Sequence, residues 1–400
     1  MTTPAQAAAA IQSHVKALPA QLTALTDLAG AILREPIVAS RDQPPFDRVT
    51  MDGIAIASNA SDAGRREFRI AGIQAAGSRQ MLLASPDACF EVMTGAVLPR
   101  GCDAVIPIEN ITIADGVAKL GDQVKPFAGM YIHARGLDCH AGSPLLEAGT
   151  RLRAPEVAVI ASTGLARVMA SRPPRIMVIS TGDELKEPGD AVEEWQIYRS
   201  NAYGVLATLK DRGFDLLAHD HLPDDLEVLR QRLQAHLEAH DVLILSGGVS
   251  MGKFDYVPQV LGELGIETIF HKVEQRPGRP LWFGVGASGT TVYALPGNPV
   301  STLVCLVRYV LAGLAISQGA PQIAPESIAL AEAADVNPKL TLFQPVRLLP
   351  DAGGGPASAL VTPTRGSGDF TSLIGTTGFV ELAPGSQPMK RGTPVPLYRW

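Results

Sequence analysis

Residues 241–252 read DVLILSGGVSMG, an unbroken apolar run that ends in two glycines and is followed closely by a third. Apolar runs of this kind are typical of parallel strands that are covered on both faces. Two similar runs occur in the chain, RIMVIS at 175–180 and TVYALP, which ends at 296. Amphipathic segments such as SNAYGVLATLKDRG at 200–213 separate the runs and predict helices. The alternation predicts a doubly wound, mainly parallel α/β sheet over 174–325.

Each of the three strands runs directly into a glycine turn. The carboxyl ends of parallel strands meet at one edge of a sheet, where ligands bind in open α/β folds. Glycine lets backbone N–H groups approach an anion, and a following helix adds the positive end of its dipole. We therefore predict a phosphate or pyrophosphate site, and ordinary loop chemistry is the alternative. The predicted binding residues are Thr181, Gly182, Asp183, Ser246, Gly247, Gly248, Ser250, Pro296, Gly297, Asn298 and Pro299.

Carboxylates lie close to the same turns. Glu184 follows the first turn, Asp224 lies near a strand end, and Asp255 follows the second turn. Carboxylates beside a phosphate site usually hold a hard divalent cation such as Mg²⁺. We therefore predict these three acids as metal ligands. The alternative for Asp224 and Asp255 is that each is the N-cap of a helix.

A basic segment precedes the third strand. Residues 272–280 read KVEQRPGRP and place Lys272, Arg276 and Arg279 near a Pro-Gly turn. Guanidinium groups bind phosphates and oxyanions bidentately, so this segment is predicted to bind an anion. A solvated edge strand is the alternative.

The rest of the chain predicts further domains, which makes the fold class multi-domain α/β plus β. Short alternating runs with Gly, Pro and Asp turns indicate β-rich structure on both sides of the α/β unit. Residues 5–37 are predicted to form two helices split at Pro19. The four predicted domains are a helical and linker domain at 1–44 plus 138–173, a β-rich lobe at 45–137, the α/β domain at 174–325 and a small C-terminal β-barrel at 326–400.

The composition excludes several classes of protein. Lys and Arg number 34 against 40 Asp and Glu, and the net charge of −6 provides no general attraction for nucleic acid or anionic membranes. The four cysteines form no CxxC pair, so neither a zinc site nor a disulfide framework is expected. The N-terminus lacks the pattern of a signal peptide, and the longest apolar stretch, 303–316, contains Arg308 and is too short to span a bilayer. We expect a cytoplasmic enzyme.

Three short motifs match known functional patterns but are not interpreted as functional sites. GVGASG at 284–289 matches a dinucleotide-binding pattern, but it lies between two predicted strands and is interpreted as a hairpin. GVSMG at 248–252 matches the nucleophile elbow of serine hydrolases, but the only later histidine is His271. His236 and His240 are spaced as a metal pair on a helix, although a solvated helix face is favoured.

A longer set of motifs resembles one family. Residues 45–55, PFDRVTMDGIA, resemble the PxFDxSxMDGYA signature of the molybdopterin molybdenumtransferase family, which includes the C-terminal domain of gephyrin. The resemblance continues, in order, through MTGA at 93–96 with Leu98, Pro99 and Gly101, STGDEL at 180–185, SGGVS at 246–250, Pro277-Gly278 and LPGNP at 295–299. The chain departs from the family pattern at Arg48-Val49, Ile54, Lys253 and Arg276.

The resemblance implies an activity and an assembly. Members insert molybdate into the dithiolene of adenylated molybdopterin, with Mg²⁺-assisted release of AMP, and so produce the molybdenum cofactor. The implied assembly is an elongated homodimer in which the β-rich lobe of one subunit approaches the α/β site of its partner. Other cofactor-biosynthesis proteins and recipient molybdoenzymes are the implied partners. A non-catalytic molybdopterin-binding scaffold and a tungstate-preferring paralogue are the alternatives.

The resemblance also implies roles for individual residues. The glycine turns would hold the pterin phosphate and its pyrophosphate link, and Arg279 would neutralise the phosphate or the oxyanion. Asp52 and Thr94 would contribute from the β-rich lobe. The implied catalytic residues are Asp52, Glu184, Asp224, Asp255, Lys272 and Arg276.

Overall fold

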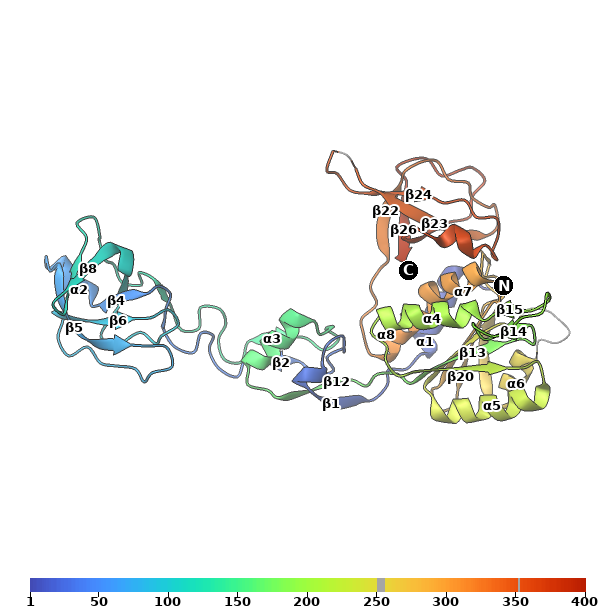
Figure 1. The fold of residues 1–400 in the computed structure, drawn as a ribbon, viewed down its shortest axis with the longest axis horizontal. Coiled ribbons are helices and arrows are strands. Elements are labelled where there is room, and N and C mark those ends of the chain that lie inside the picture. Colours follow the sequence, from blue (N-terminus) through green and yellow to red (C-terminus); the bar gives the residue numbers. More distant parts are fainter. Residues whose placement is uncertain (250–255, 352) are drawn as a thin grey trace. The chain divides into compact units, whose positions relative to one another are not determined.

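The structure is a computed structural model that describes residues 1–249, 256–351 and 353–400. The chain divides into two compact units, whose elements are labelled in Figure 1. The first unit holds the α/β sheet and the C-terminal barrel, and the second holds the β-rich lobe. The first comprises Met1–Arg34, Gly149–Arg153 and Val168–Trp400, and the second comprises Glu35–Ala148 and Ala154–Arg167.

The six-stranded sheet of the first unit confirms the α/β prediction. Its strand order is β16-β13-β17-β21-β20-β18, and the first four strands are parallel. β20 runs antiparallel to both of its neighbours, so residues 284–289 lie in a hairpin as predicted. The strands are β13 (Ile176–Thr181), β16 (Leu217–Leu222), β17 (Val242–Ser246), β18 (Ile266–His271), β20 (Trp282–Gly286) and β21 (Thr291–Leu295).

Helices cover both faces of this sheet, as a doubly wound fold requires (Figure 1). The first face packs against α1 (Pro4–His14), α4 (Ser200–Asp211) and the continuous helix formed by α7 (Pro299–Cys305), η3 (Leu306–Val310) and α8 (Leu311–Ser317). The second face packs against α5 (Leu226–Ala239) and α6 (Val257–Glu263). The segment η3 is a π-helical turn.

The predicted second N-terminal helix is wrong. After α1 the chain forms β1 (Ala20–Ala24), a 3-10 turn η1 (Leu25–Asp27) and β2 (Ile37–Val38). β1 pairs with β12 (Arg167–Ser171), and β2 pairs with β11 (Pro144–Leu146). Pairing with strands far along the chain overrides local helical preference, because strand formation depends on tertiary context.

The helix Pro299–Ser317 is apolar on all sides. By length and composition alone it could cross a membrane, but 67% of its most apolar window is buried inside the structure. One face of this helix packs against the sheet, and another packs against the barrel. Burial on more than one face explains why its apolar residues do not form a single stripe.

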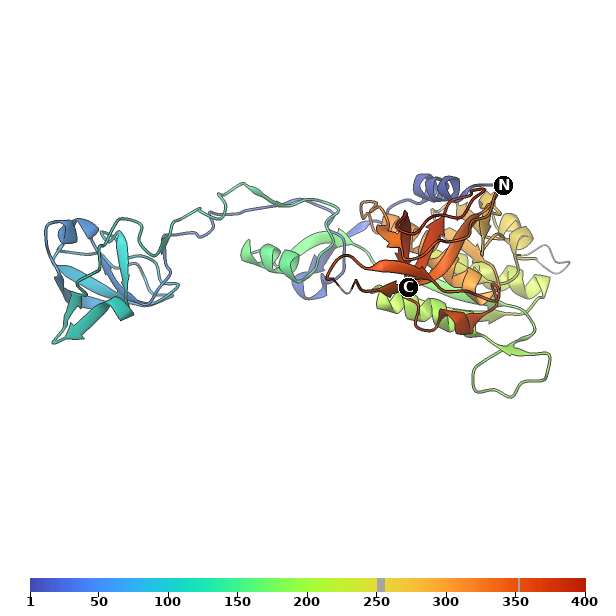
Figure 2. The same cartoon turned by 90° about the horizontal axis from the view of Figure 1, so that it is seen from above.

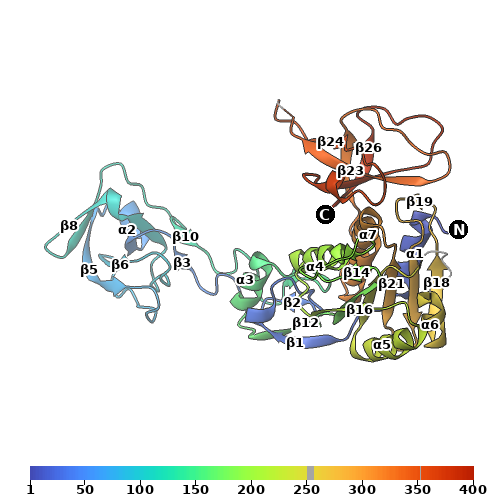
Figure 3. The same cartoon turned by 45° about the vertical axis from the view of Figure 1, so that its right-hand side comes forward.

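The C-terminal region forms a closed five-stranded barrel, which confirms the prediction. The order is β23-β24-β22-β26-β25, and β25 pairs back with β23. The strands are β22 (Glu326–Leu330), β23 (Thr341–Leu349), β24 (Ser358–Val361), β25 (Gly378–Leu382) and β26 (Pro394–Arg399). A short strand from the α/β part, β19 (Gln275–Arg276), pairs with β23 and brings the basic segment beside the barrel (Figure 3).

The second unit contains the predicted β-rich lobe. Its six-stranded sheet has the order β7-β4-β6-β5-β9-β8, with apolar clusters on it. The strands are β4 (Gly53–Ile56), β5 (Glu67–Gln74), β6 (Ala88–Val92), β7 (Ala104–Pro107), β8 (Ile111–Ala114) and β9 (Val117–Leu120). The same unit also holds β3 (Arg48–Val49), α2 (Ser58–Asp62), β10 (Ile132–His133) and the predicted short helix α3 (Ala154–Ser162).

Asp241 stabilises the amino-terminal end of β17, at the edge of the sheet opposite the glycine turns. Its two carboxylate oxygens accept hydrogen bonds from Nη1 and Nη2 of Arg172, each at 2.9 Å, and Arg175 donates further bonds. Burial raises the pKa of Asp241, but the hydrogen bonds from both arginines outweigh it and hold the pKa well below its usual range. Folding therefore favours the ionised carboxylate.

We expect Asp241→Asn to lower the free energy of unfolding at pH 7 by about 1.5–3 kcal/mol, the usual worth of a hydrogen bond to a charged group. Because the folded-state pKa is depressed, this stabilisation is fully present above the unfolded pKa of about 4 and is lost as the pH falls below it. Urea unfolding of both proteins at pH 7 and pH 3 measures the effect. The difference between the proteins should shrink at pH 3, and an equal difference at both pH values would contradict the assignment.

Candidate functional site

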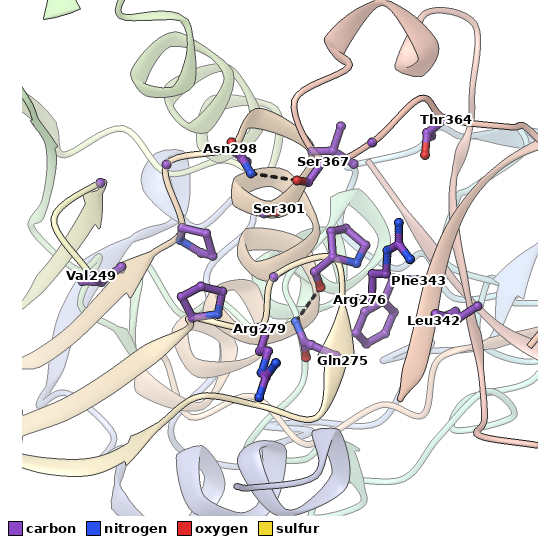
Figure 4. A pocket seen from close by; sticks show the side chains of 18 of the residues that line it. Val249, Gln275, Arg276, Arg279, Asn298, Ser301, Leu342, Phe343, Thr364 and Ser367 are labelled. Atoms are coloured by element: carbon purple, nitrogen blue, oxygen red, sulfur yellow. Dashed lines mark hydrogen bonds between the residues drawn. The ribbon is translucent and has the colours of Figure 1, made fainter. Parts of the chain in front are cut away.

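A cavity of about 1250 Å³ opens at the carboxyl edge of the α/β sheet, next to the barrel (Figure 4). Pockets for small molecules typically measure about 300–1,000 Å³, so this cavity has room for a large ligand. Its walls come from the three glycine turns, the basic segment and loops of the barrel.

Many of the predicted binding and catalytic residues line this one cavity. They are Thr181, Gly182, Glu184, Asp224, Gly247, Gly248, Arg276, Arg279, Pro296, Gly297 and Asn298. Ser250, Lys253 and Asp255 lie outside the described residues. Asp52 and Thr94 belong to the second unit.

The other described residues that were predicted in the first unit do not line the cavity. Ser246 is buried at the end of β17, and Pro299 is the first residue of α7. Asp183 accepts a hydrogen bond from the backbone N–H of Asp224 at 3.2 Å. Lys272 does not line the cavity. It follows β18 with a φ of +72°, and its backbone N–H donates to the carbonyl oxygen of Leu281 at 2.9 Å.

The first two glycine turns are in close contact. A Cβ atom on Gly247 would lie 2.7 Å from the carbonyl oxygen of Thr181 and 2.8 Å from its Oγ1. Gly247 also has a φ of +100°, which L side chains rarely adopt. The buried Oγ1 of Thr181 has no hydrogen-bond partner within the described residues. An unpaired buried hydroxyl costs about 1–3 kcal/mol, so a ligand that bonds to it is favoured here.

Asn201, in the first turn of α4, joins the second and third glycine turns. Its Nδ2 donates to Oγ of Ser246 at 2.9 Å and to the carbonyl oxygen of Gly297 at 2.8 Å. Its Oδ1 and the Oγ of Ser180 are buried without partners in the part of the chain that the structure describes. Asn201 is not among the residues predicted from the sequence, because that prediction followed strand ends and this residue starts a helix.

Two carboxylates face the cavity. The side chain of Glu184 folds back over Gly182, where an added Cβ would lie 2.5 Å from Oε2 of Glu184. Asp224 lines the same cavity, and the helix-cap alternative for it is wrong. The N-cap of α5 is Asp225, whose carboxylate accepts hydrogen bonds from two backbone N–H groups of the first turn.

The chemistry of these donors fits Mg²⁺. This ion is usually held by one or two carboxylates together with phosphate oxygens, and Glu184 and Asp224 supply two carboxylates to one cavity. Among the described residues there is no group of three His, Cys, Asp or Glu side chains that could hold a metal without further ligands. The third predicted ligand, Asp255, lies outside that set.

The barrel contributes residues that the sequence did not predict. Arg365, Thr364 and Ser367 of the barrel line the cavity. Nδ2 of Asn298 donates to Oγ of Ser367 at 2.7 Å, so the third glycine turn is bonded to the barrel (Figure 4). With Arg276 and Arg279, three arginines line one cavity of an acidic protein, which is the arrangement expected for an anion site.

The two residues predicted from the β-rich lobe, Asp52 and Thr94, are hydrogen-bonded to each other. The backbone N–H and the hydroxyl of Thr94 both donate to Oδ1 of Asp52, each at 2.7 Å. Both hydrogen bonds hold the pKa of Asp52 below its ordinary value, and the bond from the hydroxyl of Thr94 has the larger effect. An ionised, oriented carboxylate is therefore presented at the surface of the lobe.

His236, His240 and His271 make contacts within the fold. Nε2 of His236 lies 2.6 Å from the carboxylate of Asp220, and the ring of His236 packs edge-on against His240. Nε2 of His271 lies 3.4 Å from the carbonyl oxygen of Val249. Ser250, the nucleophile of the hydrolase alternative, is outside the described residues.

A segment beside the site exposes several apolar side chains. The chain between β14 (Leu185–Lys186) and β15 (Ile197–Tyr198) projects from the sheet in light green in Figure 2. Trp195 and Ile197 are exposed there, and Ile197 also lines the cavity.

Two models of known families match this chain. Residues 2–164 match the MoeA N-terminal region (domain I and II), and residues 177–315 match a probable molybdopterin binding domain.

Relatives and solved structures agree with these matches. The molybdopterin molybdenumtransferase of Synechocystis sp. is 41% identical over 374 residues, which cover 93% of each chain. The protein of the same name from Staphylococcus aureus (strain Mu50) is 30% identical over 97% of this chain and 93% of its own length. Two solved structures of the molybdopterin biosynthesis MoeA protein from Pyrococcus horikoshii each match with a TM-score of 0.81 over 100% of this chain. They are 27% and 24% identical to it and are covered over 99% and 100% of their own length.

Proposed function

Because the chain belongs to the molybdopterin molybdenumtransferase family, we propose that it inserts molybdate into the dithiolene of adenylated molybdopterin and releases AMP. As a member of this family it is a transferase of molybdenum cofactor biosynthesis. One observation carries the finer proposal: three glycine turns, two carboxylates and three arginines line a single cavity.

The glycine turns suit the phosphate groups of the substrate. In this proposal the turns around Gly182, Gly247 and Gly297 hold the pterin phosphate and the pyrophosphate link. The hydroxyl of Thr181, buried and without a partner among the described residues, donates to one of these oxygens. Backbone amides at strand ends bind phosphate without a counter-charge, because their dipoles already point at the anion.

The arginines suit the oxyanion and the leaving group. Arg276 and Arg279 would bind molybdate, and Arg365 would share the phosphate charge from the barrel side. A fixed cation such as Arg365 near the phosphoanhydride stabilises the negative charge that develops on AMP as it leaves. Together with positioning of the reactants, such stabilisation accounts for most of the catalysis of phosphoryl transfer.

The carboxylates suit a magnesium ion. Glu184 and Asp224, with Asp255, would hold Mg²⁺, which when bound neutralises the phosphoanhydride and orients its oxygens. The proposal includes a homodimer in the cytoplasm, in which the Asp52 and Thr94 pair of one subunit completes the cavity of its partner. The exposed side chains of Met51 and Met93 beside that pair support a contact surface there.

A single assay tests the proposal. Purified protein is incubated with adenylated molybdopterin and either molybdate or tungstate, with Mg²⁺ or with a chelator, and AMP is measured. We expect AMP release only when molybdate and Mg²⁺ are both present. Tight substrate binding without AMP release would favour the scaffold alternative, and release with tungstate in preference to molybdate would favour the tungstate paralogue.

A further inference from the structure

A buried glutamine lies directly beneath the turn that carries Arg276 and Arg279. Gln275 is only 1% exposed. Its Nε2 donates to the carbonyl oxygen of Pro277 at 3.1 Å, inside the turn (Figure 4). Its Oε1 accepts a hydrogen bond from the hydroxyl of Tyr309, which lies in the π-helical turn η3. The amide group therefore joins the arginine-bearing turn to the helix Pro299–Ser317.

Cys305, in the same helix as Tyr309, also contacts this amide and the turn. Its Sγ lies 3.6 Å from Nε2 of Gln275 and 3.7 Å from the carbonyl oxygen of Gly278. A Cβ atom on Gly278 would lie 2.6 Å from both Cys305 Sγ and Gln275 Nε2. The turn is therefore packed against its support without spare room, and a displaced amide would move the turn.

The backbone on either side of the turn is also fixed. The carbonyl oxygen of Thr2 accepts from the N–H of Glu274 at 2.8 Å, and the carbonyl oxygen of Glu274 accepts from the N–H of Thr341 in the barrel at 3.1 Å. The side chains of Arg276 and Arg279 are exposed, whereas the residues beneath them are buried. Gln275 is thus a buried side chain that supports the turn together with these backbone hydrogen bonds.

We propose that Gln275 is a positioning residue for the oxyanion: held by Tyr309, its amide fixes the turn so that Arg276 and Arg279 meet molybdate at a defined spacing. The inference rests on the proposed function. A guanidinium binds an oxyanion bidentately only in the correct geometry, and small displacements of a binding group reduce its contribution strongly. The role of Gln275 is therefore in the binding of molybdate and not in the release of AMP.

The test replaces the amide with an apolar side chain of similar volume. In Gln275→Met we expect the KM for molybdate to rise about tenfold, the scale of losing one or two hydrogen bonds. The kcat for AMP release at saturating molybdate should stay within about twofold of wild type. A residue that only stabilises the fold would lower the unfolding temperature without this split between KM and kcat.

A second variant and a control keep the test decisive. Tyr309→Phe keeps the aromatic ring but removes the donor to Gln275, so it should raise the KM for molybdate in the same direction. Gln318→Met makes the same chemical change at a buried glutamine that does not line the cavity, and it should leave the KM unchanged.

The possible failures are distinguishable. If the wild-type protein releases no AMP, the proposed function fails. If the wild-type protein is active but Gln275→Met retains the wild-type KM for molybdate, the inference is overturned. Should Gln275→Met not fold, an unchanged KM in Tyr309→Phe would overturn it equally.

Discussion

Glu184→Gln is expected to lower the rate of AMP release by about 100-fold or more, the scale of losing one fixed electrostatic partner in an active site. The substitution keeps the shape of the side chain and removes only its charge. The carboxylate folds over Gly182 at the mouth of the first glycine turn and lines the cavity beside Asp224. In the proposed mechanism it is a ligand of Mg²⁺, so the variant should also require a higher Mg²⁺ concentration for half-maximal activity.

The comparison needs a matched control. Glu194 is an exposed glutamate in the loop that follows Glu184, and it does not line the cavity. Glu194→Gln makes the same change of charge and should keep the wild-type rate and Mg²⁺ dependence. Thermal unfolding of both variants should match wild type, because neither side chain is buried in the core. Wild-type turnover and Mg²⁺ dependence in Glu184→Gln would remove this carboxylate from the mechanism.

The α/β sheet and its ligand-binding edge can be predicted from the sequence for a physical reason. Its central strands are buried on both faces, so they appear as unbroken apolar runs, and each runs into a glycine turn. At Gly247 the close approach of the neighbouring turn requires glycine, since an added Cβ would collide with the backbone of Thr181. Each glycine turn directly follows its apolar run, and therefore the sequence shows the strand end and the turn together.

Other parts of the site depend on contacts between distant segments. Arg365 and Ser367 reach the cavity only because β19 pairs with β23 and the barrel closes on itself. No local pattern around these residues indicates that arrangement. The sequence predicts a helix where β1 lies for the same reason, since the partner strand β12 lies far along the chain. The sequence alone does not distinguish Asp224 from a helix cap, because the neighbouring Asp225 is the residue that caps α5.

A largely buried ion pair joins the barrel to the helix Pro299–Ser317. Nε of Arg308, in η3, lies 2.9 Å from Oε2 of Glu381 in β25, and these side chains are 14% and 19% exposed. The hydroxyl of Tyr398 donates to the same carboxylate oxygen at 2.9 Å. Burial lowers the pKa of Arg308, but the charge of Glu381 outweighs it and raises the pKa. Around the pair, Val304 and Val307 of the helix pack against Phe343 and Phe379 of the barrel.

Arg308→Ala is expected to lower the free energy of unfolding by about 3–5 kcal/mol, because it leaves the carboxylate of Glu381 in a largely buried interface without its cation. It also removes the guanidinium that lies 5.0 Å from the ring of Tyr398. Urea unfolding followed by tryptophan fluorescence measures the loss. The double variant Arg308→Met with Glu381→Gln should recover much of it, because replacing both charges removes the unpaired one. Arg391→Ala, at an exposed arginine of the barrel, is the control and should unfold like wild type. If Arg308→Ala also unfolded like wild type, the ion pair would not hold the barrel to the helix, and the cavity wall that carries Arg365 would be stabilised by apolar packing alone.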